Sequence, residues 1–235
     1  MIDITFDFRS DTPPGADPDS SSPTLRRYHQ LLWSKPLPNG APFELDIATP
    51  PYLHHRSELG EFWLTSDAVI PSWSRWRKMA HIIDLISEVE REAFVHTGYT
   101  IGAMMVFPGN QVGRKPTING ARGLDRRIVD RFDLTVECIR RHYLDEPSPL
   151  SDTLARYADF FALFGDFAGY LDFFLLQDLV DEGTSTVRFF TPFEDFTPWP
   201  LPGTLDAYFG YRQLAIEFIE SRNRRIAALV SISAH

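Results

Sequence analysis

The sequence has one cysteine, few lysines and no long apolar run, and each shortage excludes a class of protein. A single cysteine among 235 residues rules out a disulfide framework and a cysteine-based structural zinc site. No apolar run approaches the roughly 20 residues that span a bilayer, and the first residues lack the basic and apolar regions of a secretory signal. Three of the 23 basic residues are lysines and the others are arginines. We expect a cytoplasmic protein that does not associate with membranes.

Apolar residues make up 43% of the chain and the net charge is -9. This composition allows a sizeable core and excludes global disorder. The length predicts a single domain over residues 1–235. The charge is unevenly placed: residues 113–142 carry a net charge of +4, whereas residues 145–195 carry -9. Such a distribution permits an anion site inside an acidic protein, or two segments that neutralise each other. It disfavours binding of long nucleic acid.

Hydrophobic periodicity predicts an α+β fold. Alternating apolar residues predict a half-buried strand over residues 2–8, and further strands are expected over 43–48, 61–69, 99–107 and 184–190. Helices are expected over 23–35, 72–94, 124–144, 151–180 and 204–229, with a polar loop at 9–22 and a proline-rich connector at 192–202. Because the strands come early without regular βαβ alternation, we expect a mixed or antiparallel sheet from the N-terminal half, packed by long helices from the C-terminal half.

Common catalytic and metal-binding motifs are absent. The segment 109–117 resembles a phosphate loop but has the wrong glycine spacing, and Pro116 removes a backbone donor. Asp11, Asp17 and Asp19 share one loop, but they miss the spacing of a calcium loop, and aspartates in turns commonly cap their own backbone. We therefore expect no metal site, and no cofactor is indicated. Cys138 is predicted to be a buried structural residue.

The stretch from Thr117 to His142 is the first candidate site. Asn119, Gly120 and Gly123 are expected just before a helix N-terminus, where free backbone N–H groups and the helix dipole favour anions. Arginines add bidentate phosphate contacts. The sequence thus predicts binding of a phosphate-bearing small molecule or nucleotide through these residues: Asn119, Arg122, Arg126 and Arg131. The alternative is ion pairing along a solvated helix face.

Residues 9–29 form the second candidate. Arg9 is expected to help bind the anion, while Asp11 and His29 are expected to perform acid–base or metal chemistry, because histidine titrates near neutral pH. The alternative is turn capping by the aspartates, with His29 as a partly buried polar residue.

A different class of function remains open, in which the protein is a non-catalytic interaction module. The acidic segment 145–195 and exposed arginines at positions 222, 224 and 225 would then dock a protein partner or a second copy of the chain. The aromatic residues of 157–174 could stack on bases, but their acidic neighbours favour a role in the core. Whether the protein is an enzyme is not decided by these patterns.

Two stretches resemble a family of bacterial proteins classified only as a domain of unknown function. The first is Phe6-Asp7-Phe8-Arg9-Ser10-Asp11-Thr12-Pro13, which continues through Asp17-Pro18-Asp19 and residues 22–35. The second is Thr117-Ile118-Asn119-Gly120-Ala121-Arg122-Gly123, followed by residues 130–143. The resemblance extends over nearly the whole chain. It implies a bacterial, cytoplasmic, single-domain protein, and it brings no activity, cofactor or catalytic residue. It coincides with the two candidate stretches and so favours them as one shared site.

Overall fold

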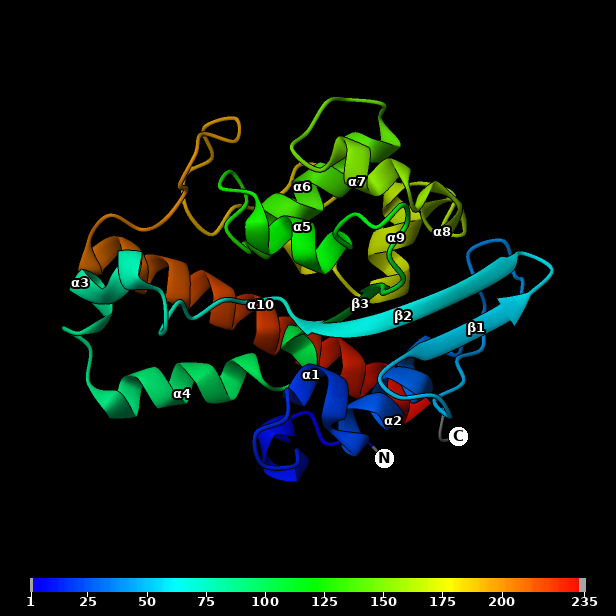
Figure 1. The fold of residues 1–235 in the computed structure, drawn as a ribbon, viewed down its shortest axis with the longest axis horizontal. Helices are drawn as coiled ribbons and strands as arrows, with labels where there is room; N and C mark the ends of the chain where they lie inside the picture. Colours follow the sequence, from blue (N-terminus) through cyan, green and yellow to red (C-terminus); the bar gives the residue numbers. More distant parts are fainter. Residues whose placement is uncertain (1, 233–235) are drawn as a thin grey trace.

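The computed structural model describes residues 2–232 and places a small antiparallel sheet among many helices (Figure 1). The strands are β1 (Leu53–Ser57), β2 (Gly60–Ala68) and β3 (Met104–Pro108). The α-helices are α1 (Pro18–Ser21), α2 (Pro23–Trp33), α3 (Ala80–Ile83), α4 (Glu88–Gly98), α5 (Ile118–Leu124), α6 (Phe132–Tyr143), α7 (Ser151–Ala155), α8 (Ala158–Ala162), α9 (Phe167–Phe174) and α10 (Leu205–Ile232). The 3-10 helices are η1 (Phe8–Asp11), η2 (Arg77–Met79), η3 (Ile101–Ala103) and η4 (Gln177–Leu179). This is the α+β fold that the sequence predicts.

The strand order is β1-β2-β3, with both pairs antiparallel. A tight turn joins β1 to β2, where Ser57 pairs with Gly60. Leu64 in β2 lies opposite both Leu53 and Pro108, so it ties the three strands together. In Figure 1, α5 to α8 lie above the sheet and α1 and α2 lie below it. Every residue of β3 is buried, as expected for a strand covered on both faces.

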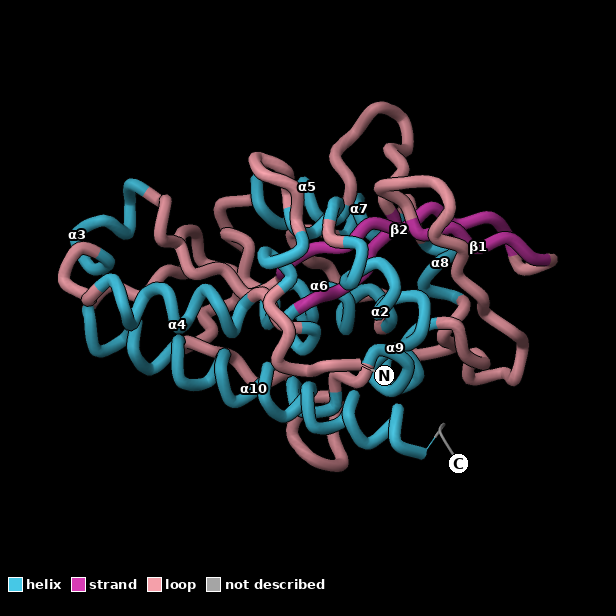
Figure 2. Tube along the Cα trace, turned by 90° about the horizontal axis from the view of Figure 1, so that it is seen from below, coloured by secondary structure: helices cyan, strands magenta, loops and turns pink. Residues whose placement is uncertain are grey.

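Helix α10 runs along the long axis of the molecule, with α4 beside it in both Figure 1 and Figure 2. Its side chains bond to segments far away in the chain: the Tyr211 hydroxyl donates to the carbonyl of Pro71 at 2.7 Å. The buried apolar residues form one cluster that extends from Phe8 to Ile226. Across residues 2–232, none of the helices has the length and apolar character needed to cross a lipid bilayer.

Helix α2 confirms the predicted start at Ser22 and Pro23, since the Ser22 side chain accepts a hydrogen bond from the Leu25 amide at 3.1 Å. Three further expectations are also met. These are β2 for the predicted strand 61–69, α10 for the predicted helix 204–229, and burial of the aromatic rings of 157–174 in the core. Such elements have strong local signals, which explains why the sequence predicted them.

The strand predicted over residues 2–8 is wrong. Asp3 accepts a hydrogen bond from the Thr5 amide, and Asp7 accepts one from the Arg9 amide, each at 2.9 Å. Aspartate side chains that bond to nearby backbone amides compete with strand pairing. The segment therefore forms turns that lead into η1, although its period of two is clear.

Two predicted helices are interrupted or shortened in the structure. The helix predicted over 72–94 breaks before α4, because Ser87 caps the start of a new helix: its hydroxyl oxygen accepts the Glu90 amide at 3.3 Å and its hydroxyl donates to the Glu90 carboxylate at 2.7 Å. The helix predicted over 124–144 begins only at Phe132, as α6, because residues 125–131 form a turn in which Val129 and Asp130 have left-handed φ angles of 45° and 67°. A β-branched residue rarely adopts this conformation, so the sequence carries little warning of the break.

The strand predictions for 43–48 and 184–190 are also wrong, because only the single bridges Asp46–His54 and Val180–Val187 form there. The strand predicted over 99–107 begins instead as η3 and continues as β3. Strand β1 was not predicted, since its polar sequence gives no apolar alternation.

Candidate functional site

The first residue of interest is Arg131, which immediately precedes α6 and is fully buried. Its Nε donates to Asp133 Oδ1 at 3.1 Å, and its Nη2 donates to the other carboxylate oxygen. The Nη1 group donates to the Thr191 hydroxyl and, at 3.0 Å, to the Pro200 carbonyl. Arg131 therefore clamps the segment around Thr191 and Pro200 onto the start of α6.

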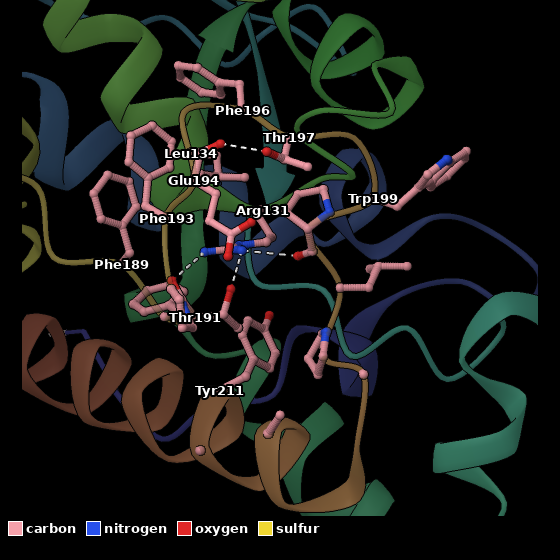
Figure 3. A pocket seen from close by; sticks show the side chains of 18 of the residues that line it. Arg131, Leu134, Phe189, Thr191, Phe193, Glu194, Phe196, Thr197, Trp199 and Tyr211 are labelled. Atoms are coloured by element: carbon pink, nitrogen blue, oxygen red, sulfur yellow. Dashed lines mark hydrogen bonds between the residues drawn. The ribbon is translucent and has the colours of Figure 1, made fainter.

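A cavity of about 520 Å³ lies between this segment, α6 and α10 (Figure 3). Apolar and aromatic groups form most of its wall, with Arg131 on one side. The residues that line it include Arg131, Phe189, Phe193, Glu194, Phe196, Trp199, Gly210, Tyr211 and Leu214. Pockets of this size, with mainly apolar walls and a few polar groups, are typical of small-molecule sites.

The segment that covers the cavity, residues 189–203, has an unusual backbone. Asp195, Phe196 and Trp199 all have left-handed φ angles, of 42°, 60° and 65°. Non-glycine residues adopt this conformation at a cost, and such residues gather at binding sites and switch regions. The Trp199 amide donates to the carbonyl of Arg126 at 2.7 Å, and Lys78 Nζ lies 3.0 Å from the centre of the Trp199 ring. Contacts outside the segment thus hold its conformation.

A second anchor comes from α6, where Arg141 reaches the same segment. Its Nη2 donates to Asp195 at 2.8 Å, and its guanidinium lies 4.9 Å from the centre of the Phe196 ring. On α6 itself, Arg140 and Arg141 both pair with Glu137, with N–O distances of 2.8 Å. This pairing corresponds to the structural alternative that the sequence left open for the later arginines of the stretch.

Arg122 is buried in the last turn of α5, just before the turn at residues 125–131 that leads to α6. Its Nη1 lies 2.6 Å from Asp67 Oδ2 and 2.7 Å from Asp130 Oδ1. Its Nη2 donates to the carbonyls of Val69, at 3.1 Å, and Asp130, and its Nε donates to the Thr135 hydroxyl at 3.2 Å. Intramolecular acceptors therefore engage each nitrogen of the Arg122 guanidinium.

The two candidate stretches, residues 9–29 and 117–142, meet around Arg122, where Asp19 of α1 comes from the first stretch. The Asp19 Oδ2 accepts the Ala68 amide at 2.9 Å, while its buried Oδ1 has no hydrogen-bond partner within residues 2–232. Burial raises the pKa of Asp19 to about 6; the Ala68 amide opposes the rise, and Asp130 adds to it. Burial likewise raises the pKa of Asp67 against the opposing effect of Arg122. The result is a carboxylate cluster with one arginine, formed by Asp19, Asp67, Asp130 and Arg122.

The predicted catalytic pair, Asp11 and His29, serves structural roles in this geometry. Asp11 accepts the Ser22 hydroxyl at 2.5 Å and the Thr24 amide at 3.0 Å, which secures the start of α2. His29 is fully buried and accepts the Trp33 indole N–H at Nδ1, so its Nε2 carries the proton and donates to Ser66 at 2.9 Å. A catalytic role for this pair stays a prediction, and the burial of His29 weighs against it.

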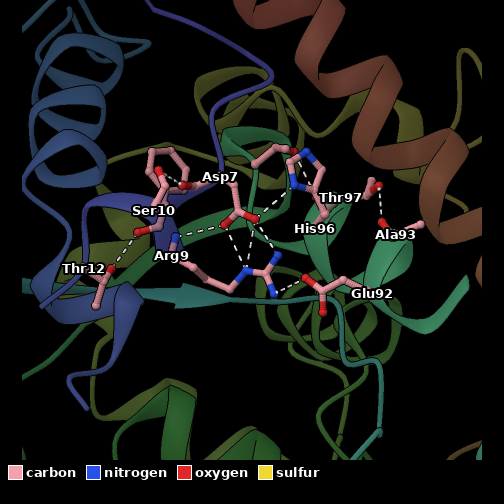
Figure 4. A network of polar contacts seen from close by, with 10 residues as sticks. Asp7, Arg9, Ser10, Thr12, Glu92, Ala93, His96 and Thr97 are labelled. Carbon is pink, nitrogen blue, oxygen red and sulfur yellow. Dashed lines mark hydrogen bonds and ion pairs between the residues drawn. The ribbon is translucent and has the colours of Figure 1, made fainter. Parts of the chain in front are cut away.

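Arg9 belongs to a separate surface network (Figure 4). It pairs with Asp7 at 2.5 Å and with Glu92 of α4 at 2.8 Å, while His96 Nδ1 lies 3.0 Å from the same Asp7 carboxylate. The guanidinium also lies 5.4 Å from the centre of the Tyr99 ring. These contacts tie the N-terminal segment to α4.

The remaining predicted ligand-binding residues differ in exposure. Asn119 lies inside α5, after the Thr117 cap, and its buried Oδ1 has no hydrogen-bond partner in the described chain. Arg126 is exposed on the turn between α5 and α6. The expected helix N-terminus after Gly123 is wrong, because α5 already begins at Ile118 and Arg122 lies in its last turn. The structure thus distributes Asn119, Arg122, Arg126 and Arg131 over the interior and the surface.

Two further expectations can be compared with the structure. Within residues 2–232, no group of three or more histidine, cysteine or acidic side chains is placed to hold a metal ion. The prediction that Arg222 is exposed is wrong: it is fully buried and donates to the carbonyls of Phe174, Gly102 and Met104 at 3.1, 3.0 and 2.7 Å. Arg224 is exposed, and Arg225 pairs with Asp178 at 2.6 Å.

Of the predicted ligand-binding residues, Arg131 is the one that lines the cavity. The aromatic residues of the covering segment were not predicted as functional. Residues 192–202 contain four prolines and three aromatic residues. This composition was a usable signal, because an irregular segment rich in aromatic rings can form the wall of a cavity. Its partners on α6 and α10 lie too far away in the chain for the sequence to indicate them.

Residues 2–226 match a family model described as "Family of unknown function (DUF6994)". Neither the curated proteins nor the solved structures contain a match to the chain.

Proposed function

The chain belongs to this family of unknown function, so we propose a function from geometry alone: the protein binds a small molecule with an apolar body in the cavity beside Arg131. The observation that carries the proposal is the cavity itself, about 520 Å³ and walled mainly by aromatic, proline and aliphatic groups. Ligand pockets commonly have this size and character. Trp199 and Leu214, which are 45% and 43% exposed, give the cavity an apolar rim.

The phosphate-binding prediction receives less support from the same geometry. Arg131 is paired with the fully buried Asp133, and Arg122 is paired with Asp67 and Asp130. A guanidinium that already has carboxylate partners offers little attraction to a phosphate. Arg126 is exposed and remains the residue through which a phosphate could be held.

Filling the cavity provides a direct test. Gly210 lies in α10 on the cavity wall, and a Cβ built there meets nothing within 4 Å. We expect Gly210→Phe to fold, because most residues favour a helix interior more than glycine does. Thermal denaturation would be followed with indole, 2-naphthol, ATP and glucose 6-phosphate. A ligand at 100 times its Kd adds about 2.7 kcal/mol of stability.

We expect an aromatic compound to stabilise the wild type, and Gly210→Phe to remove that shift. Gly210→Ala is the matched control, since it makes the same helix-favouring change but leaves the cavity open. An aromatic shift that persists in Gly210→Phe would overturn the proposal. A shift from ATP or glucose 6-phosphate alone, lost in Arg126→Ala, would restore the phosphate prediction.

A further inference from the structure

The charge of the cavity wall comes from Glu194. Arg131 contributes no free positive charge, because Asp133 neutralises it through both carboxylate oxygens. The carboxylate of Glu194, in contrast, has no hydrogen bond or ion pair within residues 2–232, although it lines the same cavity. Its neighbour Asp195 is directed to Arg141. Among the residues that line the cavity, Glu194 is therefore the charged side chain without a charged partner.

The backbone holds Glu194 in place. Its carbonyl accepts the Thr197 hydroxyl at 2.7 Å and the Thr197 amide at 3.1 Å. The turn that these bonds close is fixed further by the contacts of Arg141 with Asp195 and Phe196. Glu194 is thus an exposed carboxylate on an anchored turn rather than on a free loop, and Figure 3 shows it among the cavity residues.

The aromatic rings beside Glu194 already attract cations. Lys78 lies over Trp199, and Arg141 lies over both Phe193 and Phe196. The faces of aromatic rings carry partial negative charge, which attracts ammonium and guanidinium groups. Phe189 stacks on Phe193 with ring centres 4.2 Å apart and so extends the aromatic wall. Rings and carboxylate together favour a positive ligand.

We infer that the ligand of this cavity carries a cationic head, an ammonium or a guanidinium, on its apolar body, and that Glu194 pairs with this head. The inference rests on the proposed function, since it names the chemical class of the molecule that the cavity binds. The overall charge of -9 acts in the same direction, because an acidic protein attracts cations at long range.

The test compares three probes that share a phenyl ring: phenethylammonium, neutral 2-phenylethanol and anionic phenyl phosphate. Titration calorimetry on the full chain measures the Kd of each. We expect phenethylammonium to bind up to about fivefold more tightly than 2-phenylethanol, the range of an exposed ion pair. Raising the salt concentration to about 0.5 M should reduce this ratio, because salt screens exposed charges.

Glu194→Gln should lower the affinity for phenethylammonium by up to about fivefold and leave the affinity for 2-phenylethanol unchanged. Glu58→Gln is the matched control, because Glu58 is exposed on the β1–β2 turn and its removal makes the same change in net charge. Equal affinities of the wild type for the charged and neutral probes would overturn the cationic head and leave the apolar cavity standing. Failure of all three probes would overturn both proposals, and tightest binding of phenyl phosphate would overturn the cationic head alone.

Discussion

Arg122 on α5 and Asp67 on β2 form an ion pair of 2.6 Å between residues 55 positions apart in the chain, and the arginine is fully buried. Removing the guanidinium would leave Asp67 and Asp130 without their positive partner. We expect Arg122→Met to lower the free energy of unfolding by about 3–5 kcal/mol, as is usual when one member of a buried pair is removed. Urea denaturation measures this change.

Arg127→Met is the control for that experiment. Arg127 pairs with Asp125 at 2.7 Å, but its side chain is 43% exposed, so its loss should cost about 0–1 kcal/mol. If Arg122→Met is as stable as Arg127→Met, the buried pair contributes nothing to folding. Arg122 would then return to the set of ligand-binding candidates.

His29 should make the protein sensitive to acid. Burial, with Arg222 and Arg26 adding to it, lowers the pKa of His29 to about 3, whereas an unfolded histidine titrates near 6.5. Between these two pKa values the unfolded state binds more protons than the folded state. The free energy of unfolding therefore falls as the pH falls, by up to about 1.4 kcal/mol per pH unit. At neutral pH, where the histidine is largely neutral in both the folded and the unfolded state, this loss of stability is absent.

His29→Gln removes this titration. We expect the variant to be less stable than the wild type at pH 7, because Trp33 and Ser66 lose their histidine partner, and the gap to narrow as the pH is lowered to 4. Guanidinium denaturation at several pH values measures the gap. If the free energies of unfolding of the two proteins change in parallel with pH, His29 is not both neutral and buried in the native state.

Cys138 should be unreactive in the native protein. It is fully buried on α6, and burial raises the pKa of its thiol to about 12. Because the thiolate is the reactive form, the native thiol should react with Ellman's reagent at pH 8 at least about a hundredfold more slowly than the thiol of the urea-unfolded chain. Similar rates in the two states would contradict the burial of Cys138.

Arg141 should control the mobility of the segment that covers the cavity. In Arg141→Met the contacts to Asp195 and Phe196 are lost, so amide hydrogen exchange in residues 193–199 should rise, by up to about fivefold. Arg140→Met is the matched control, since Arg140 pairs with the same Glu137 but forms no hydrogen bond, ion pair or cation–π contact with residues 193–199 of the described chain. Equal exchange in both variants would show that the Glu137 pairing, rather than Asp195, holds the segment.

Local signals in the sequence predicted much of the secondary structure. Ser22 and Pro23 define the start of α2 by their own chemistry, and the apolar stripe of α10 is long enough to outweigh competing patterns. The alternation of residues 2–8 failed as a strand signal because Asp3 and Asp7 bond to their own backbone. This competition depends on the geometry of the aspartate side chains, which the spacing of apolar residues does not reveal.

The candidate site depends on contacts that sequence separation hides. The charge pattern around Arg122 suggested partners three or four residues away, but its first partner is on β2. The cavity draws its wall from the α6 start, the 189–203 segment and α10. Proline and aromatic content indicated that the 192–202 segment was irregular, but only the folded chain shows that Arg131 holds it.

The position of α10 has a consequence for how the chain is made. Tyr211 and Arg222 bond to carbonyls of Pro71, Gly102 and Met104, so the middle of the core is completed by the last helix described. Contacts this distant in sequence form late and slow folding. During synthesis, the segments that α10 covers stay open to water until residues 205–232 have left the ribosome. Until then, a chaperone would find on them the apolar surface that α10 later occupies.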